Sequence, residues 1–218
     1  MDNALSNVNG HIRAAAFRAK TRPMCNLYRM EKAPDAIVGL ARELGVEIGF
    51  PDGVPNFEPR DVRITERAPI VRSAGAAPGG FELVDRRWSW PAPTGKPVFN
   101  FRGEGRRFAP AERCVVLADG FYEFTAPADP KAKRKERWLF TWPGHDWFGI
   151  AGIVRHDPGV GEAFTMLTCP PGPDIAPYHD RQVVLLSPRD CFGWLDPASA
   201  AQDFLQPLPE GSLAVAAA

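Results

Sequence analysis

The chain lacks the features that mark membrane-spanning proteins, disulfide-rich secreted domains and zinc-binding domains. No apolar run reaches the length of a transmembrane helix, and no hydrophobic leader segment is recognisable. The cysteines form no CxxC pair, the spacing typical of structural zinc sites. We therefore expect a cytoplasmic, monomeric protein, nucleoid-associated if bacterial. We also expect it to have reduced thiols and no metal, cofactor or membrane partner.

The chain also lacks net charge, because its 26 Lys and Arg residues balance its 26 Asp and Glu residues. No global field therefore draws it to nucleic acid. The charge is nevertheless uneven, since residues 86–137 hold 12 Lys and Arg against 6 Asp and Glu, a local excess of +6. Such a basic middle suits a local groove for a polyanion. For the run KAKRKER at 131–137 alone, a solvated basic loop is the simpler interpretation.

The sequence is rich in turn-forming residues, and this favours short strands over long helices. Its 218 residues include 23 prolines and 20 glycines. We expect strands near 62–72, 81–90, 97–102, 113–124, 137–142, 147–155, 163–169 and 182–187. Helices are predicted over 35–44, capped by Asp35, over 187–195, capped by Ser187, and over 199–206. The pattern predicts one α+β domain over residues 24–218, with a closed or sandwiched sheet and a few short flanking helices.

Residues 1–23 differ from the rest of the chain. They carry four basic residues against the single acid Asp2, with little apolar periodicity. The segment could be a targeting sequence or a pro-segment, or it could follow an upstream start codon that the cell does not use. We favour the last interpretation and expect this extension to be disordered, removed or not translated.

Several polar side chains stand where strands are expected to end. Asn100 and Arg102 share one side of a strand by alternation, and Glu123 ends the apolar run CVVLADGFYEF. Partial desolvation between Tyr122 and Phe124 would raise the pKa of Glu123 towards general acid–base use. Taken singly, Asn100 could equally satisfy a turn, and Glu123 could pair with an arginine.

Two further stretches carry candidate binding residues. His179 and Arg181 precede an expected buried strand, and Trp88 stands beside Arg86 and Arg87. An aromatic ring next to arginines suits base stacking and phosphate contact. Alone, however, His179 would more often cap a strand, and Trp88 would more often belong to the core.

The pair Met24-Cys25 suggests another kind of chemistry. If translation began at Met24 and that residue were removed, Cys25 would carry a free amine beside its thiol. An internal cysteine does not have this pair of nucleophiles. Taken alone, Cys25 would more often be a small buried hydrophobic residue.

These motifs, in this order, resemble the SOS response-associated peptidase (SRAP) family, whose members act on abasic sites in DNA. The resemblance runs from Met24 to the helix after Trp194. It rests on Met24-Cys25, on the looser match Arg87-Trp88-Ser89-Trp90-Pro91, and on Asn100-Phe101-Arg102-Gly103-Glu104, Asp119-Gly120-Phe121-Tyr122-Glu123 and His179-Asp180-Arg181. Asn26-Leu27, Phe124 and Gln182-Val183 depart from the family pattern.

The resemblance implies that the N-terminal amine and thiol of Cys25 capture the aldehyde of an abasic site in single-stranded DNA as a thiazolidine. It further implies that Glu123 moves protons, that His179 assists, and that Asn100 positions the amine. The DNA-binding residues would be Trp88, Arg102, Phe124 and Arg181. The resemblance also suggests a role in the SOS response to DNA damage and a weak lyase activity.

Two alternatives remain open from the residues. One is a thiol peptidase, a hydrolase that uses Cys25, His179 and Asn100 and could act as a protease on the chain's own first 24 residues. The other is a non-covalent single-stranded DNA binder.

Overall fold

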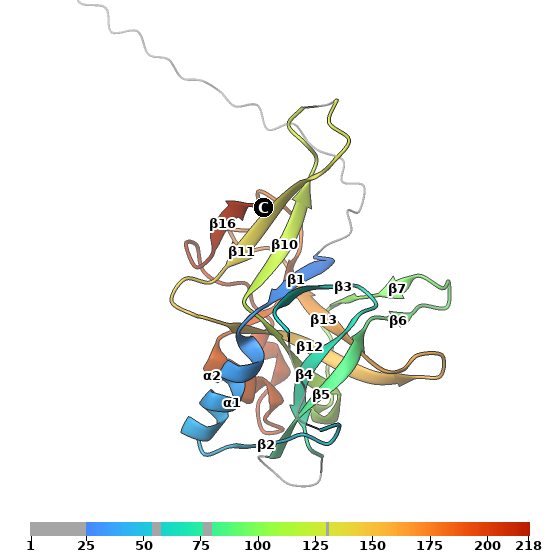
Figure 1. Ribbon diagram of the computed structural model, residues 1–218, viewed down its shortest axis with the longest axis vertical. Coiled ribbons are helices and arrows are strands. Elements are labelled where there is room, and N and C mark those ends of the chain that lie inside the picture. Colours follow the sequence, from blue (N-terminus) through green and yellow to red (C-terminus); the bar gives the residue numbers. More distant parts are fainter. Residues whose placement is uncertain (1–24, 54–57, 76–79, 130) are drawn as a thin grey trace, which may run out of the picture.

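The computed structural model describes residues 25–53, 58–75, 80–129 and 131–218. The predicted extension at residues 1–23 lies outside them. The described chain forms two large sheets and a small hairpin, with two α-helices and two 3₁₀ helices (Figure 1). This confirms the expected strand-rich α+β class.

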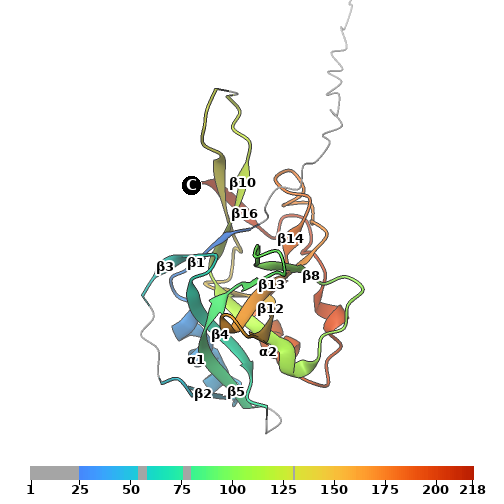
Figure 2. The ribbon, with the colours of Figure 1, turned by 90° about the vertical axis from the view of Figure 1, so that its right-hand side faces the viewer.

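The first sheet has five strands. Their order is β16 (Ala214–Ala217), β11 (Glu136–Thr141), β10 (Gly120–Thr125), β1 (Leu27–Met30) and β3 (Arg60–Arg63). The strand pairs within it are antiparallel. β10 and β11 rise together as a hairpin that extends beyond the body of the molecule (Figure 2).

The second sheet closes on itself. Its main path is β14 (Gln182–Val183), β13 (Gly161–Cys169), β12 (Phe148–Asp157), β9 (Arg113–Ala118), β4 (Arg67–Ser73), β5 (Gly80–Trp88) and β2 (Glu47–Gly49). β8 (Asn100–Arg102) adds to β13, and β15 (Leu185–Leu186) adds to β12. Because β13 also pairs with β5, strands β13, β12, β9, β4 and β5 form a closed ring. β6 (Trp90–Pro91) and β7 (Pro97–Val98) form a separate hairpin.

Alternation along the ring strands divides the apolar residues into two clusters. Along β9, Cys114 and Val116 belong to one cluster, which takes residues from all five ring strands and packs them against Tyr28 and Phe121 of the first sheet. Val115 and Leu117 belong to the other cluster, with the helices. The ring is therefore buried on both faces.

The helices cover the second cluster. α1 (Ala33–Glu43) buries Ile37 and Ala41, and α2 (Pro188–Leu195) buries Trp194. The predicted cap of α2 is confirmed, since the Ser187 side chain accepts a hydrogen bond from the Asp190 N–H at 3.2 Å. The 3₁₀ helices are η1 (Pro110–Glu112) and η2 (Ala201–Phe204), and η2 stands where a short α-helix was expected.

Some predicted boundaries were wrong. The N-cap position of α1 is Lys32, and Asp35 lies in the first turn, where its charge favours the helix dipole. The run expected as one strand over 62–72 is β3 and β4, separated by a turn with Thr65 at a φ of 77°. The run over 113–124 is also two strands, because it passes at Asp119 from the ring into the first sheet.

Candidate functional site

Cys25 stands immediately before β1, fully buried, and two distant side chains hold its backbone. Its N–H donates to Glu123 Oε1 at 3.1 Å, and Asn100 Nδ2 donates to its carbonyl oxygen at 3.1 Å. Its thiol contacts the Leu27 carbonyl oxygen at 3.5 Å. Three of the predicted catalytic residues therefore meet at one point.

The strand pairings explain this meeting. β1 and β10 run antiparallel with Tyr28 opposite Phe121, and this register places Glu123 beside the residues that precede β1. β8 lies on β13 with Asn100 opposite Met166, which places its amide within reach of the same backbone. The site is thus assembled where the ring and the first sheet meet.

Burial determines the protonation of this site. Glu123 is fully buried, and desolvation, helped by the charge of Asp180, raises its pKa to about 8, against the lowering effect of the Cys25 N–H. At neutral pH its carboxyl is therefore mostly neutral. Burial also raises the pKa of the Cys25 thiol, as does the charge of Glu123 once that carboxyl ionises, so the thiol stays protonated at neutral pH.

His179 approaches the site from the loop before β14. The ring is buried, and its Nδ1 lies 3.1 Å from the Arg181 N–H, which donates to it, and 3.0 Å from Asp180 Oδ1. Within the described part of the chain, neither His179 Nε2 nor the second oxygen of Glu123, Oε2, has a hydrogen-bond partner, and both atoms are buried. A buried polar atom without a partner is costly, so these two atoms are suited to hydrogen bonds with a polar molecule that enters the site.

Hydrogen bonds to other residues of the protein hold the Arg181 guanidinium in place. Its guanidinium binds the two carboxylate oxygens of Glu104 and donates to Thr168 Oγ1 at 3.0 Å and Thr168 O at 2.9 Å. Arg102, by contrast, is exposed on β8. The two predicted phosphate ligands are therefore differently available, since Arg102 is exposed at the surface and Arg181 is engaged with an acid.

The two aromatic residues predicted to contact DNA differ from Arg102 in their exposure. Trp88 is fully buried, its ring stacked on Phe164 and its Nε1 donating to the Phe99 carbonyl oxygen at 2.9 Å. In this structure it is a core side chain, without an exposed face for a base. Phe124 is half-buried and, by alternation along β10, lies on the sheet face opposite to Glu123.

Sequence reasoning gave no role to three residues that shape the site: Asp180, Glu104 and Thr168. Asp180 and Glu104 lie within the motifs on which the family resemblance rests, so those motifs could have identified them as residues of the site. Thr168 lies inside the apolar strand β13, and nothing in its local sequence marks it as a partner of Arg181.

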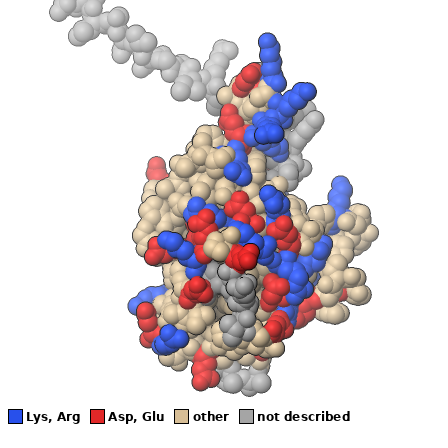
Figure 3. All heavy atoms as spheres, in the orientation of Figure 1, with Lys and Arg blue, Asp and Glu red and all other residues tan. Residues whose placement is uncertain are grey.

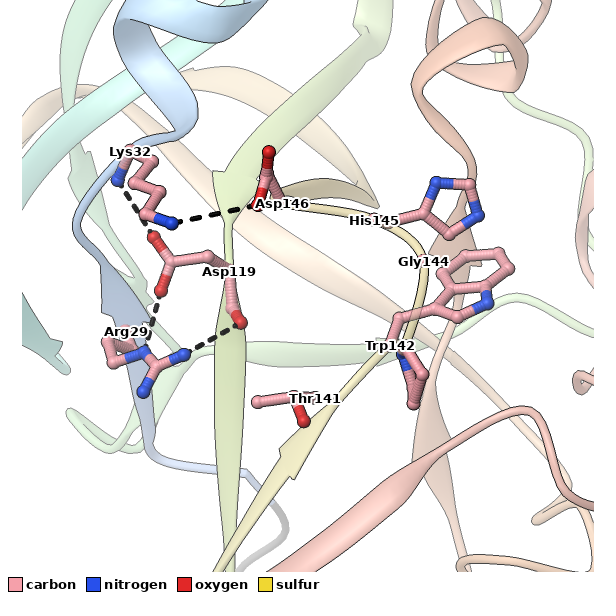
Figure 4. A pocket seen from close by; sticks show the side chains of 9 residues that line it. Arg29, Lys32, Asp119, Thr141, Trp142, Gly144, His145 and Asp146 are labelled. Atoms are coloured by element: carbon pink, nitrogen blue, oxygen red, sulfur yellow. Dashed lines mark hydrogen bonds and ion pairs between the residues drawn. The ribbon is translucent and has the colours of Figure 1, made fainter.

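A surface pocket lies near the other end of β1 (Figure 4). Its lining includes Arg29, Lys32, Asp119, Trp142, His145 and Asp146. Asp119 accepts from Arg29 Nε at 2.7 Å and from the Lys32 N–H at 3.0 Å. These bonds join the start of β10 to the turn that leads into α1. They support the alignment of β1 and β10, on which the contact between Cys25 and Glu123 depends.

Within the described residues, no group of three or more His, Cys, Asp or Glu side chains could hold a metal ion. The same part of the chain has no helix that is long and apolar enough to cross a membrane.

Comparisons with known proteins agree on one family. The sequence profile described as SOS response associated peptidase (SRAP) matches residues 24–217. The Bacillus subtilis abasic site processing protein YobE is 28% identical over 137 residues, 59% of this chain and 56% of the relative. YoqW of the same organism is 28% identical over 132 residues, 56% of this chain and 58% of the relative. The matched segments thus span little more than half the length of these curated relatives.

Solved structures share the fold. A crystal structure of a protein from Bordetella bronchiseptica aligns with a TM-score of 0.65 at 23% identity, over 89% of this chain and 99% of that one. A protein from Bacteroides thetaiotaomicron aligns with a TM-score of 0.62 at 16% identity, over 88% of this chain and 91% of that one.

Proposed function

The chain belongs to the SOS response-associated peptidase family, and on that premise we propose that it processes abasic sites in single-stranded DNA. In this proposal the residues before Cys25 are removed, and the exposed cysteine shields the abasic site through a covalent thiazolidine crosslink. The curated relatives are named abasic site processing proteins, and this supports the substrate class.

One observation carries the proposal: the Cys25 nitrogen lies 3.1 Å from a buried carboxyl, that of Glu123. In the unprocessed chain this nitrogen is a peptide amide, whose lone pair is delocalised into the carbonyl. After removal of the preceding residues, the same nitrogen would be an amine beside a group that can exchange protons with it.

In the unprocessed chain the pKa of the Glu123 carboxyl lies close to the ordinary pKa of an α-amine. An α-amine has a pKa of about 7.7–8.0 in reference peptides, and burial raises the pKa of Glu123 to about 8. A proton can therefore pass between them at little cost near neutral pH, and the amine can become neutral for attack. The neutral amine attacks the aldehyde carbon of the ring-opened sugar, and loss of water, assisted by a proton from Glu123, leaves an imine.

The thiol then closes the ring. Because burial keeps the Cys25 thiol protonated, its sulfur adds to the imine carbon while its proton goes to the nitrogen. Closure is intramolecular, so its effective concentration is high. The product is a five-membered thiazolidine, which shields the lesion covalently.

The surrounding residues have supporting roles in this scheme. Asn100 holds the Cys25 carbonyl and so orients the amine. His179 Nε2 and Glu123 Oε2, both buried without partners in the described structure, are suited to the opened sugar's hydroxyl and to the departing water. Arg102 offers an exposed guanidinium to a flanking phosphate.

The alternatives receive less support. A thiol peptidase needs a thiolate nucleophile, whereas burial favours the neutral Cys25 thiol, and no hydrogen bond between described residues joins that thiol to His179. A purely non-covalent binder would not need a buried carboxyl at the Cys25 nitrogen. Weak lyase activity would follow if the imine lost the neighbouring phosphate by elimination before the ring closed.

The test uses protein that begins at Cys25, confirmed by intact mass, and an abasic single-stranded oligonucleotide. We expect an adduct that survives boiling in detergent, and we expect Cys25→Ala to abolish it. Cys25→Ser keeps the amine but lacks the thiol, so it should form only an adduct that borohydride must trap. Undiminished, denaturant-resistant crosslinking by Cys25→Ala would overturn the proposal.

A further inference from the structure

The hairpin formed by β10 and β11 carries a strongly basic tip that the proposed chemistry does not use. We call residues 126–129 and 131–135, between the two strands, the hairpin tip. Its four cations, Lys131, Lys133, Arg134 and Lys135, are all exposed. Figure 3 shows Lys and Arg side chains gathered at the end of this projection, away from the body of the molecule.

The acids near these cations are occupied elsewhere. Asp129 Oδ1 accepts the Lys131 N–H at 2.9 Å, and Glu136 Oε1 accepts the Ala128 N–H at 2.8 Å. Glu136 also accepts from the Thr125 hydroxyl at 3.3 Å. Across the described residues, no carboxylate forms an ion pair with any of the four cations. The hydrogen bonds of these acids shape the loop, and the tip carries four cations against the single acid Asp129, a net charge of +3.

The tip is also directly connected to the site. Glu123 lies two residues before Thr125, the last residue of β10, and the tip begins at the next position. A DNA strand that placed one nucleotide at Cys25 and ran along β10 would bring its phosphates towards the tip. Arg137, the second residue of β11, continues the basic side chains back towards the sheet and lies 5.0 Å from the centre of the Tyr122 ring.

We infer that the hairpin tip is a second nucleic-acid contact, which binds backbone phosphates of the DNA beside the abasic site without regard to sequence. The identity of this polyanion rests on the proposed function. The binding itself does not, because it requires neither the Cys25 amine nor an aldehyde.

The composition of the tip favours DNA over other anionic partners. Its apolar side chains are only alanine and proline, so it lacks the large apolar groups that insert into a membrane interface. It also lacks the aromatic and aliphatic anchors that dominate protein–protein interfaces. Closely spaced cations without anchors are sufficient for phosphate binding, because that binding is driven by release of counterions.

The experiment measures how the full chain binds an undamaged single-stranded oligonucleotide, by fluorescence anisotropy over a series of salt concentrations. The triple variant Lys133→Gln, Arg134→Gln and Lys135→Gln removes three charges from the tip. Each lost phosphate contact lowers the slope of log K against log salt by about 0.7 for single strands. We therefore expect the slope to fall by about 2 and the affinity at low salt to fall at least tenfold.

The matched control removes three exposed charges from other elements, Arg42→Gln on α1, Lys96→Gln between β6 and β7, and Arg189→Gln on α2. We expect it to keep most of the wild-type slope. A tip variant that keeps its charge, Lys133→Arg, Arg134→Lys and Lys135→Arg, should bind like the wild type. An unchanged slope in the neutral tip variant, or an equal loss in the control, would overturn the inference. The inference would also be overturned if the neutral tip variant lost binding to vesicles of anionic phospholipid but not to DNA.

Failure of this inference is distinguishable from failure of the proposed function. If the tip variant bound DNA normally while protein beginning at Cys25 still formed the adduct, only the inference would be wrong. If no adduct formed but the tip variant still lost its salt-dependent affinity, the tip would remain a DNA contact and the crosslinking proposal would fall.

Discussion

Glu123 is a buried carboxyl whose ionisation the folded protein disfavours, and this links stability to pH. The ordinary pKa of such a group is near 4.5, and burial raises that of Glu123 to about 8. Between these values the folded chain keeps a proton that the unfolded chain releases. The contribution to stability is therefore full at low pH and decreases as pH rises towards 8, by at most about 1.4 kcal/mol per pH unit.

We predict that Glu123→Gln removes this dependence in the chain that retains residues 1–24. The amide has nearly the same shape and does not titrate. Urea unfolding at pH 5, 6, 7 and 8 should show wild-type stability falling relative to the variant as pH rises. A constant difference across this range would mean that Glu123 has an ordinary pKa, and its place in the proton-transfer scheme would lose its basis.

Arg181 and Glu104 form a pair in which an acid competes with a potential phosphate ligand. We predict that Glu104→Gln strengthens binding of undamaged single-stranded DNA by up to about fivefold, since an ion pair with an exposed partner contributes about 0.2–1 kcal/mol. The measurement is equilibrium anisotropy at low salt, with Glu43→Gln on α1 as the control for removal of one exposed acid. Weaker binding would instead assign Glu104 to positioning Arg181 for DNA.

At the scale of elements, the ring tolerates little added volume where its strands approach closely. A Cβ at Gly152 on β12 would lie 2.9 Å from the Thr165 carbonyl oxygen and 3.0 Å from Cys114 Sγ, whereas a Cβ at Gly39 on α1 would meet nothing within 4 Å. We predict that Gly152→Ala destabilises the protein by about 1–3 kcal/mol. Gly39→Ala should be neutral or stabilise it by up to about 1 kcal/mol.

Denaturant unfolding of the two variants tests this directly, because the substitution is chemically identical and only its surroundings differ. If the two alanines changed the free energy of unfolding equally, neighbouring ring strands would have to move apart easily. That result would contradict a closed sheet that is buried on both faces.

At the scale of the whole molecule, the state of the N-terminus should separate binding from chemistry. We predict that protein retaining residues 1–24 binds undamaged DNA about as well as protein beginning at Cys25 but forms no stable adduct with an abasic site. The amide nitrogen of Cys25 cannot form an imine, while Arg102 and the hairpin tip are present in both forms. Both forms are tested side by side after mass spectrometry has verified each N-terminus.

Equal crosslinking by the two forms, with the extension still attached, would show that the Cys25 amine is not the nucleophile. Loss of residues 1–24 on standing, blocked by Cys25→Ala, would instead support the peptidase alternative as a maturation step.

The amino-acid sequence was sufficient for local structure and for recognition of the family. Turn residues and short apolar runs predicted a strand-rich α+β domain, and the serine cap of α2 was predicted because capping depends only on neighbours along the chain. Prediction from neighbouring residues failed where contacts with distant residues determine the bounds of an element. The start of α1 is supported by Asp119, which accepts the Lys32 N–H from 87 residues away, and Asp35 was wrongly assigned as its cap.

The sequence by itself thus determined the family and, through the order of five short motifs, which residues we propose carry the chemistry. Only the tertiary structure decided how these residues meet. The contact between Cys25 and Glu123 spans 98 residues and depends on the register of β1 against β10, which no local pattern specifies. Burial also depends on all the packed elements together. It placed Trp88 in the core rather than at a surface, and it raised the pKa of Glu123, because removal of water disfavours a charge wherever the fold closes around it.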